Sequence, residues 1–169
     1  GKISVNQVGQ PDHLLRNNGD GTFNDVSQRA GIGGGGKGNS ATWWDYNDDG
    51  WLDLYVGNDF NDPDKLYRNQ GDGTFTDVSV AAGVRSVKDY YAFTAVAADF
   101  DQDGWQDIYI ACDSTPSIFF LNNGDGTFQD GTVAPLGADQ NGMGSAVGDF
   151  NGDGHLDWLV TSIYNGTTK

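Results

Sequence analysis

The chain has 169 residues and a formal net charge of -15, with 26 glycines, 9 basic residues and 24 acidic residues, all of them aspartates. This charge argues against nucleic acid or an anionic membrane surface as a partner. No stretch is long and apolar enough to insert into a membrane. The length predicts a single domain that can bury a core.

The first recognisable element runs from residue 11 to residue 27 and reads PDHLLRNNGDGTFNDVS. Its N-x-G-D-G centre lies between two short strand-like stretches and predicts a tight β-hairpin, in which glycines supply positive φ angles. Similar segments begin 52 and then 53 residues further along. Turn formation accounts for the aspartates of this motif, Asp20, Asp72 and Asp125, and we favour it over a metal contact.

A second motif begins at Asp45 with DYNDDGWLD and returns at Asp99 and Asp149. Side-chain oxygens at positions 1, 3, 5 and 9, with glycine at position 6, suit a hard cation that takes six to eight oxygen ligands in flexible geometry. We therefore predict three Ca²⁺ sites, with the carbonyl of position 7 as a further ligand. The predicted ligands are Asp45, Asn47, Asp49, Trp51 and Asp53; Asp99, Asp101, Asp103, Trp105 and Asp107; and Asp149, Asn151, Asp153, His155 and Asp157.

An EF-hand and a turn without metal both fit these loops less well. An EF-hand needs a glutamate at position 12 and a helix on either side, but position 12 is Val56, Ile110 or Val160 and strand-like residues follow each loop. A polar turn without metal does not account well for three matching copies. Magnesium is disfavoured because it demands strict octahedral geometry.

The two motifs alternate, and together they predict a repeat of four short strands. Internal repeats of about fifty residues indicate propellers or solenoids. Small residues in the first strand of each repeat suit crowding near a central axis. The expected fold is all-β, with four-stranded blades of the β-propeller type. The chain is expected to hold a half blade at 11–28, blades at 40–80 and 92–132, and a half blade at 143–163.

Several aromatic side chains have two interpretations. The rings of Trp51 and Trp105 and the imidazole of His155 could stack on sugars, but we favour packing on a neighbouring blade or strand.

Other aromatic residues are expected to contribute to the core. The phenylalanines that follow the hairpin turns should pack between blades, and one of two adjacent tryptophans should point inward. These residues are Phe23, Phe75 and Phe128, and Trp43 and Trp44.

The loops resemble those of FG-GAP or VCBS repeats, which include the calcium loops of integrin α-subunit propellers. Two segments, ACDSTPSIFFLNNGDGTF and GMGSAVGDFNGDGHLDWLV, resemble the repeats of the cartilage acidic protein family and its ASPIC/UnbV-associated relatives. The resemblance extends from Pro11 to Val160. It implies a secreted or cell-surface propeller with calcium in its blade hairpins and an adhesive or matrix role.

The number of blades is small for a propeller. Two whole blades and two complementary halves amount to three, whereas propellers usually close with four to eight. The chain could be a fragment of a larger propeller, or the half blades of different copies could pair head to tail into a ring or filament. Closure within one chain is disfavoured because three blades curve too tightly.

The expected function is a non-enzymatic, calcium-binding, extracellular repeat protein for adhesion or for building a matrix or fibre, with extracellular protein or glycan as further partners. No catalytic residue is predicted. The alternative is a fragment of a carbohydrate-binding propeller or of a calcium-dependent polysaccharide-active enzyme.

Two single residues complete the predictions. Cys112 is expected to be a small buried residue, and Asn165 begins a possible N-glycosylation sequence.

Overall fold

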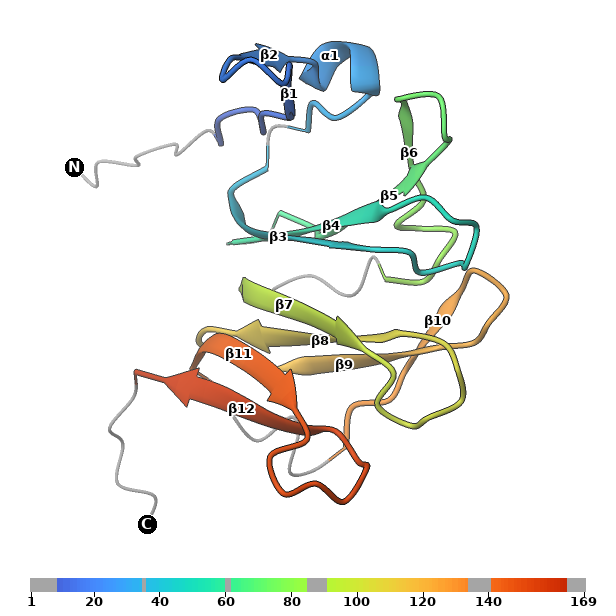
Figure 1. Ribbon diagram of the computed structural model, residues 1–169. Helices are drawn as coiled ribbons and strands as arrows, with labels where there is room; N and C mark the ends of the chain where they lie inside the picture. The colour runs from blue at the N-terminus through green and yellow to red at the C-terminus, as the bar shows by residue number, and fades with distance from the viewer. Residues whose placement is uncertain (1–8, 35, 60–61, 85–90, 134–140, 164–169) are drawn as a thin grey trace, which may run out of the picture.

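The computed structural model describes residues 9–34, 36–59, 62–84, 91–133 and 141–163, and its antiparallel sheets lie one after another in a row (Figure 1). The strands are β1 (Leu15–Asn17), β2 (Phe23–Asp25), β3 (Gly38–Trp44), β4 (Asp53–Asn58), β5 (Lys65–Asn69), β6 (Phe75–Asp77), β7 (Ala92–Ala98), β8 (Asp107–Cys112), β9 (Ile118–Asn122), β10 (Phe128–Asp130), β11 (Gly142–Gly148) and β12 (Asp157–Ser162). The helix in the described ranges is α1 (Ser27–Ala30), which ends at Gly31 with a φ of 79°.

Four sheets make up the described chain. Two have four strands in the orders β3-β4-β5-β6 and β7-β8-β9-β10, and two have two strands, β1-β2 and β11-β12. Each four-stranded sheet follows the chain, as expected of a propeller blade. The predicted fold class, with two whole blades and two complementary halves, is confirmed.

The two motifs connect the strands as predicted from the sequence. The aspartate-rich loops join β3 to β4, β7 to β8 and β11 to β12, and the N-x-G-D-G turns join β1 to β2, β5 to β6 and β9 to β10. In the turn of the first whole blade, Asp72 Oδ1 accepts hydrogen bonds from Thr74 N at 2.9 Å and from Thr74 Oγ1 at 2.6 Å. Asp20 and Asp125 make the same pair of bonds. These aspartates therefore have the turn role that we favoured.

The core lies between the sheets. The largest cluster joins the two whole blades, and in it Phe128 packs on Tyr46 with ring centroids 5.8 Å apart. Phe75 packs against a second cluster, which joins the first whole blade to Leu14 and Ile32 on either side of the β1-β2 sheet in the chain. Phe23 is 57% exposed because the described chain offers it no preceding sheet. The expected packing between blades therefore holds for two of the three phenylalanines.

The expectations about individual buried side chains agree with the structure. Trp44 is buried in the core whereas Trp43 is exposed. Cys112 is a buried, free cysteine, and burial raises the pKa of its thiol to about 12. The Asn165 sequence lies outside the described residues. In the described part of the chain no helix is long and apolar enough to cross a membrane.

Main-chain atoms of successive sheets approach one another closely at two boundaries in the described chain. Phe128 N donates to the carbonyl oxygen of Ala82 at 2.8 Å, which ties the segment after β6 to the outer strand of the next blade. A Cβ on Gly83 would lie 2.9 Å from Phe128 O, and one on Gly31 would lie 2.9 Å from Phe75 O. Both glycines also have positive φ. Glycine is therefore favoured at each position for two reasons, the backbone conformation and the nearby carbonyl oxygen.

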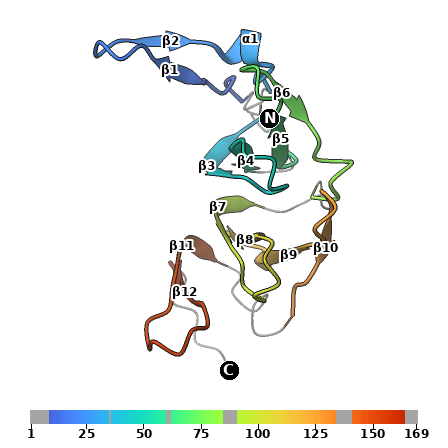
Figure 2. The same ribbon diagram turned by 45° about the vertical axis from the view of Figure 1, so that its right-hand side comes forward.

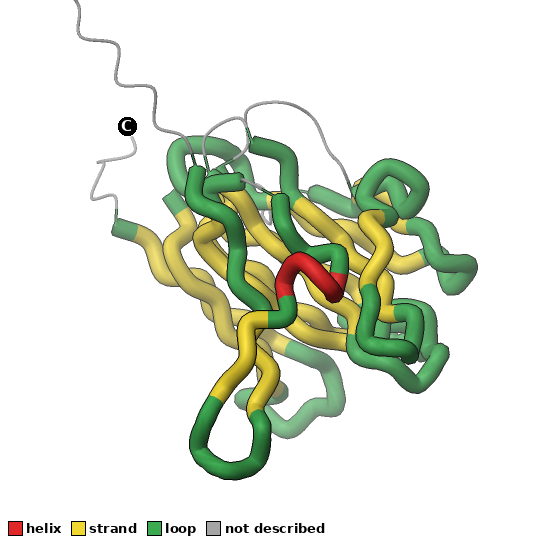
Figure 3. Tube along the Cα trace, turned by 90° about the horizontal axis from the view of Figure 1, so that it is seen from above, coloured by secondary structure: helices red, strands yellow, loops and turns green. Residues whose placement is uncertain are grey.

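The first strands lie side by side along the row. Strand β3 packs against β7, and β7 packs against β11 (Figure 2). Asn39 Nδ2 donates to Ala92 O at 3.1 Å, and Thr42 Oγ1 donates to Ala95 O at 2.8 Å. The two-stranded sheets stand at the two ends of the row, and the β1-β2 hairpin beside α1 extends beyond the other sheets (Figure 3). The described arrangement is therefore open at both ends.

Candidate metal centre

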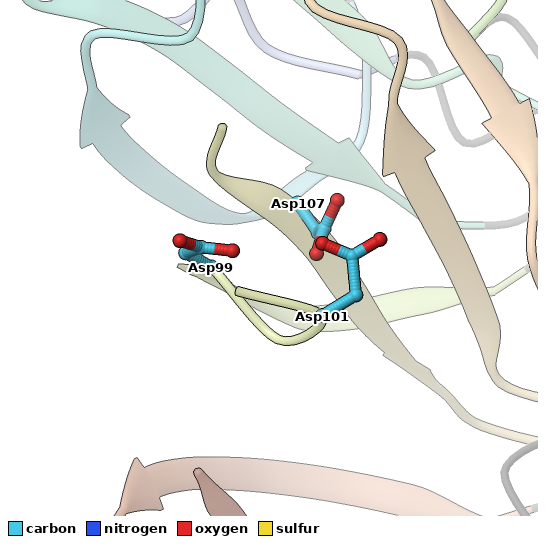
Figure 4. A group of neighbouring side chains, drawn as sticks. All are labelled: Asp99, Asp101 and Asp107. Atoms are coloured by element: carbon cyan, nitrogen blue, oxygen red, sulfur yellow. The ribbon is translucent and has the colours of Figure 1, made fainter. Parts of the chain in front are cut away.

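The second aspartate-rich loop brings three carboxylates together. Asp99 and Asp101 lie after β7 and Asp107 begins β8, and one oxygen of each lies within 4.8 Å of the others (Figure 4). Asp107 is fully buried. Like charges this close repel one another strongly unless a cation or protons neutralise them.

The backbone of the loop folds around the carboxylate at position 1. Asp99 accepts hydrogen bonds from Asp103 N at 3.1 Å and from Gly104 N at 3.0 Å. The equivalent bonds measure 3.1 and 2.8 Å in the first loop and 3.2 and 2.9 Å in the third. The side chain at position 5 accepts from the N–H of position 7 in all three loops. The three loops therefore share one conformation.

Two positions in each loop have positive φ. Position 6 is glycine throughout, and Gly104 has a φ of 97°. Position 4 is also left-handed, with Asp48 at 54° and Gln102 at 63°, and it is glycine only in the third loop. The sequence indicated the first requirement but gave no clear sign of the second, because a non-glycine residue occupies position 4 in two copies.

The carboxylate at position 9 links the loop to the third strand. Asp107 accepts from Phe100 N at 3.1 Å and from Asn122 N at 2.9 Å. Asp53 accepts in the same way from Tyr46 N at 3.3 Å and from Asn69 N at 2.7 Å. Burial raises the pKa of both carboxyl groups to about 6, and neighbouring aspartates also act to raise it. Both whole blades therefore place a buried carboxylate beside other aspartates, and a cation bound there would offset the repulsion between them.

A buried oxygen in the first loop tests whether a metal fits. Asn47 Oδ1, at position 3, is buried without a hydrogen-bond partner within the described chain, while Asn47 Nδ2 donates to Asp49 Oδ2 at 2.9 Å. A buried acceptor without a partner is costly. A hard cation among carboxylate and amide oxygens would satisfy it, and oxygen-only donors of this kind suit Ca²⁺. The residues of the loop therefore fit a calcium ion.

The position-7 tryptophans pack within their own sheet. A Cβ on Gly71 would lie 2.8 Å from the Trp51 ring, and one on Gly124 would lie 2.6 Å from Trp105 Nε1, so each tryptophan lies directly on the glycine of its hairpin turn. The two tryptophan rings therefore pack, as we favoured, but on the hairpin turn of their own blade rather than on a neighbouring blade or strand. Trp51 nevertheless remains 52% exposed.

Sequence reasoning missed a buried polar pair beside the first blade. Tyr55 Oη donates to Asp64 Oδ2 at 2.6 Å, and Asn58 N donates to Asp64 Oδ1 at 2.8 Å. Burial raises the pKa of Asp64 to about 6. Ser117 occupies the equivalent place in the next blade and accepts from Cys112 N at 3.2 Å. The signal that could have found this pair is a polar residue directly after a proline in each repeat.

A further contact joins two of the loops. Gln102 Nε2, at position 4 of the second loop, donates to the carbonyl oxygen of Gly154 in the third. The loops of neighbouring sheets are thus connected directly, as well as through the core.

The fold and the repeated oxygen-rich loops define the chain as a repeat protein of the β-propeller type. The FG-GAP-like repeat matches residues 3–56, 45–110 and 99–160. These matches cover most of the chain, and the protein belongs to the FG-GAP-like repeat family.

Relatives of known name are similar over most of this chain. Cartilage acidic protein 1 of Xenopus tropicalis is 30% identical over 178 residues, and that of Homo sapiens is 32% identical. The matches cover 89% of this chain but only 25% and 24% of those proteins. The chain therefore spans about a quarter of the length of these relatives, and the resemblance expected from the sequence is confirmed.

A solved structure is similar in fold. A lectin of Agrocybe aegerita, described as specifically recognising non-reducing terminal N-acetylglucosamine, matches with a TM-score of 0.50 and 25% sequence identity. The match covers 90% of this chain and 41% of the lectin.

Proposed function

We propose that this protein is a non-enzymatic, extracellular repeat module that binds calcium in its three aspartate-rich loops and serves in adhesion or as a unit of a matrix or fibre, with half blades that join copies head to tail. The observation that carries the proposal is the convergence of Asp99, Asp101 and Asp107 within 4.8 Å in a loop whose conformation recurs twice. The ligands in each loop are the residues at positions 1, 3, 5, 7 and 9.

Calcium would act chiefly on stability. The chain's own residues would provide the oxygens and orient them through backbone hydrogen bonds. The ion would supply positive charge that offsets the negative charge of the carboxylates. Because a metal that binds only the folded state stabilises it by mass action, each site adds about 2.7 kcal/mol at one hundred times the dissociation constant. Sites of modest affinity are filled where calcium is abundant, which favours an extracellular location.

The non-enzymatic assignment rests on the use of the carboxylates. In the described residues, the carboxylates that come together are Asp99, Asp101 and Asp107 of the second loop, so a catalytic pair among them would need the same oxygens that hold the ion. Incubation with acidic polysaccharides, followed by absorbance for unsaturated products, checks this assignment. Product formation would favour the polysaccharide-active alternative.

Calorimetric titration tests the calcium sites. We expect three Ca²⁺ ions per chain, with much weaker binding of Mg²⁺. Asp49→Asn should weaken one of the three sites about tenfold or more, because it removes a predicted ligand charge while keeping the side-chain shape. Asp48→Asn is the matched control: Asp48 is the exposed neighbour at position 4, outside the predicted ligand set. Equal calcium affinities in the two variants would contradict the first site.

A second candidate function is carbohydrate binding as part of a larger propeller. It is favoured by the fold shared with the lectin and by the exposed ring of Trp51, since aromatic faces stack on sugars. Binding to glycans that end in N-acetylglucosamine, compared between the protein and Trp51→Ala, tests it. Absence of binding to a broad glycan panel would leave the adhesive or matrix role.

A further inference from the structure

We propose that the β1-β2 sheet of one copy of this chain completes the β11-β12 sheet of a second copy, forming a four-stranded composite blade in the order β11-β12-β1-β2. This inference rests on the proposed function, whose head-to-tail assembly it makes specific. In the described ranges, β12 has a strand on one side only, and so has β1. The two halves are the first and second pairs of strands of the same repeat.

The whole blades define the register of the composite blade. Tyr55 pairs with Leu66 in the first blade, and Tyr109 pairs with Phe119 in the second. These residues lie two positions after the aspartate that begins the second strand and three before the asparagine that ends the third. The same count places Leu159 of one copy opposite Leu14 of the other.

The hydrogen-bonding groups at the two open edges are complementary. In the whole blades the asparagine that ends the third strand donates its backbone N–H to the position-9 aspartate, as from Asn122 to Asp107 at 2.9 Å. Its side-chain Nδ2 donates to the carbonyl before that aspartate, as from Asn122 to Gln106 O at 3.0 Å. The corresponding donors belong to Asn17 in β1, and the corresponding acceptors are Asp157 and the carbonyl of Leu156.

One end of this interaction is visibly incomplete. Asp157 accepts through Oδ2 from Phe150 N at 3.2 Å, as the other position-9 aspartates do within their loops. The described chain places no third strand beside its Oδ1. Asn17 on the other half already accepts from Gly19 N through its Oδ1 at 2.8 Å. The hairpin is thus preorganised with its amide donors at the open edge, which lowers the entropic cost of binding.

The packing of the position-7 side chain gives an independent match. Trp51 and Trp105 lie on the glycines of their hairpin turns, Gly71 and Gly124. The equivalent glycine of the β1-β2 hairpin is Gly19, and a Cβ built there has nothing within 4 Å. In the composite blade the exposed His155 of the second copy would cover this glycine.

Apolar surfaces at the two ends also correspond. A cavity of about 880 Å³ lies beside β11-β12, lined by Phe150, Trp158 and Leu159 among others, and Phe150 is 85% and Leu159 64% exposed. At the other end, Phe23 is equivalent to Phe128, which packs on Tyr46 of the preceding blade. The residue equivalent to Tyr46 beside the composite blade is Phe100, which already contacts Trp158 with ring centroids 5.1 Å apart. Phe23 of one copy would therefore pack on Phe100 of the other.

The contact is head to tail, so it closes into a ring or continues as a filament. Two copies of the described residues hold six blades' worth of strands, a number within the usual range for closed propellers. For a chain that holds these strands alone, we therefore infer a closed dimer with two composite blades.

Solution mass tests the assembly. In saturating calcium we expect a dimer by light scattering. Asn17→Asp keeps the acceptor for Gly19 N but removes the amide donor and places a carboxylate opposite Asp157, so it should weaken the dimer at least tenfold. Asn18→Asp carries the same charge change one residue away and should leave the dimer intact. A chain that remains monomeric at all concentrations while binding three calcium ions would overturn the composite blade but leave the calcium proposal standing; loss of calcium binding in the unaltered protein would contradict the proposed function whatever its mass.

Cysteine cross-linking tests the register. Mild oxidation of the double variant Leu14→Cys, Leu159→Cys should join separate chains, because directly opposite residues of paired antiparallel strands meet disulfide geometry. The control Leu15→Cys, Leu159→Cys places the two cysteines on opposite faces and should not cross-link. Cys112 is buried and does not interfere. Cross-linking of the control alone would overturn the register.

Discussion

Strands β8 and β12 follow the same kind of loop but differ in their surroundings. Every residue of β8 is buried, whereas β12 is exposed or half-buried along its length. Tyr109 at the third position of β8 is buried, and Leu159 at the same position of β12 is 64% exposed. Both strands pair with a first strand in the same register, including the shift at its beginning.

This difference shows which properties belong to the repeat and which depend on its neighbours. The loop conformation and the first pairing form in both places, because backbone hydrogen bonds within the loop determine them. Burial of the second strand and the second bond of the position-9 aspartate require a third strand. The complete blade is therefore the better stabilised unit, and variants at matched positions of whole and half blades can break or sharpen that contrast.

Removal of calcium should have the largest effect. If three sites each contribute about 2.7 kcal/mol, excess EGTA should lower the melting temperature by roughly 20 °C. Thermal unfolding followed by circular dichroism measures this. Asp103→Ala should reproduce about one third of the loss in free energy. An unchanged melting curve would contradict calcium stabilisation.

Loss of the position-9 carboxylate should cost more in the complete blade. Asp107→Ala removes a buried acceptor of two backbone N–H groups and should destabilise the protein by about 3 kcal/mol beyond any loss of metal affinity. Asp157→Ala removes one exposed bond and should cost about 1 kcal/mol. Urea unfolding of both variants in EGTA, at a concentration that keeps the protein monomeric, makes the comparison. Equal losses would show that the third strand adds nothing at this position.

The proline-adjacent aspartates should differ in their pH dependence. Burial raises the pKa of Asp64 to about 6 from 3.8, so its carboxyl group is protonated in the folded protein at a pH where it is still ionised in the unfolded chain. Its contribution to stability is full below pH 3.8 and is lost as the pH rises through about 6.

Unfolding at pH 4 and at pH 7.5 measures this contribution. Relative to Asp64→Asn, the unaltered protein should lose about 2 kcal/mol of unfolding free energy over that interval. Asp12, at the same place beside the β1-β2 sheet, has a pKa raised by its weaker burial, so Asp12→Asn should show a smaller change. The same change for both variants would contradict the difference in burial.

The turn glycines should give the smallest contrast. Alanine at Gly71 must accept positive φ and also displace the Trp51 ring, whereas alanine at Gly19 faces only the strain in φ. We expect about 2 kcal/mol for Gly71→Ala and about 1 kcal/mol for Gly19→Ala. Denaturant unfolding at a concentration that keeps the protein monomeric measures both. A larger cost at Gly19 would contradict the packing of Trp51 on its turn.

Much of the fold could be predicted from local patterns. The N-x-G-D-G turns and the aspartate loops have short-range chemistry, so their strands followed directly, and the order within each sheet follows the chain. The role of Asp72 as a turn residue was also accessible, because a threonine two positions later is its partner. Burial was harder, since Phe23 and Phe128 have the same local sequence but different neighbours.

The details of the candidate site depend on contacts between distant residues. The bond from Asn122 to Asp107 joins positions 15 residues apart, and that from Asn122 Nδ2 to Tyr46 O joins positions 76 apart. Residue type and spacing within a loop carry no sign of either. The left-handed conformation of Gln102 was equally hidden, because that residue type does not indicate positive φ.

The glycine contacts between blades have a consequence for how the row grows. Gly31 and Gly83 place main-chain atoms of one blade against a carbonyl of the next, so the step from sheet to sheet is set by the backbone. We expect side chains on the facing surfaces to be exchangeable for others of similar volume without a change in the spacing of the sheets. A duplicated repeat would bring its own glycine to this position, so the spacing between neighbouring sheets would be kept in a longer row.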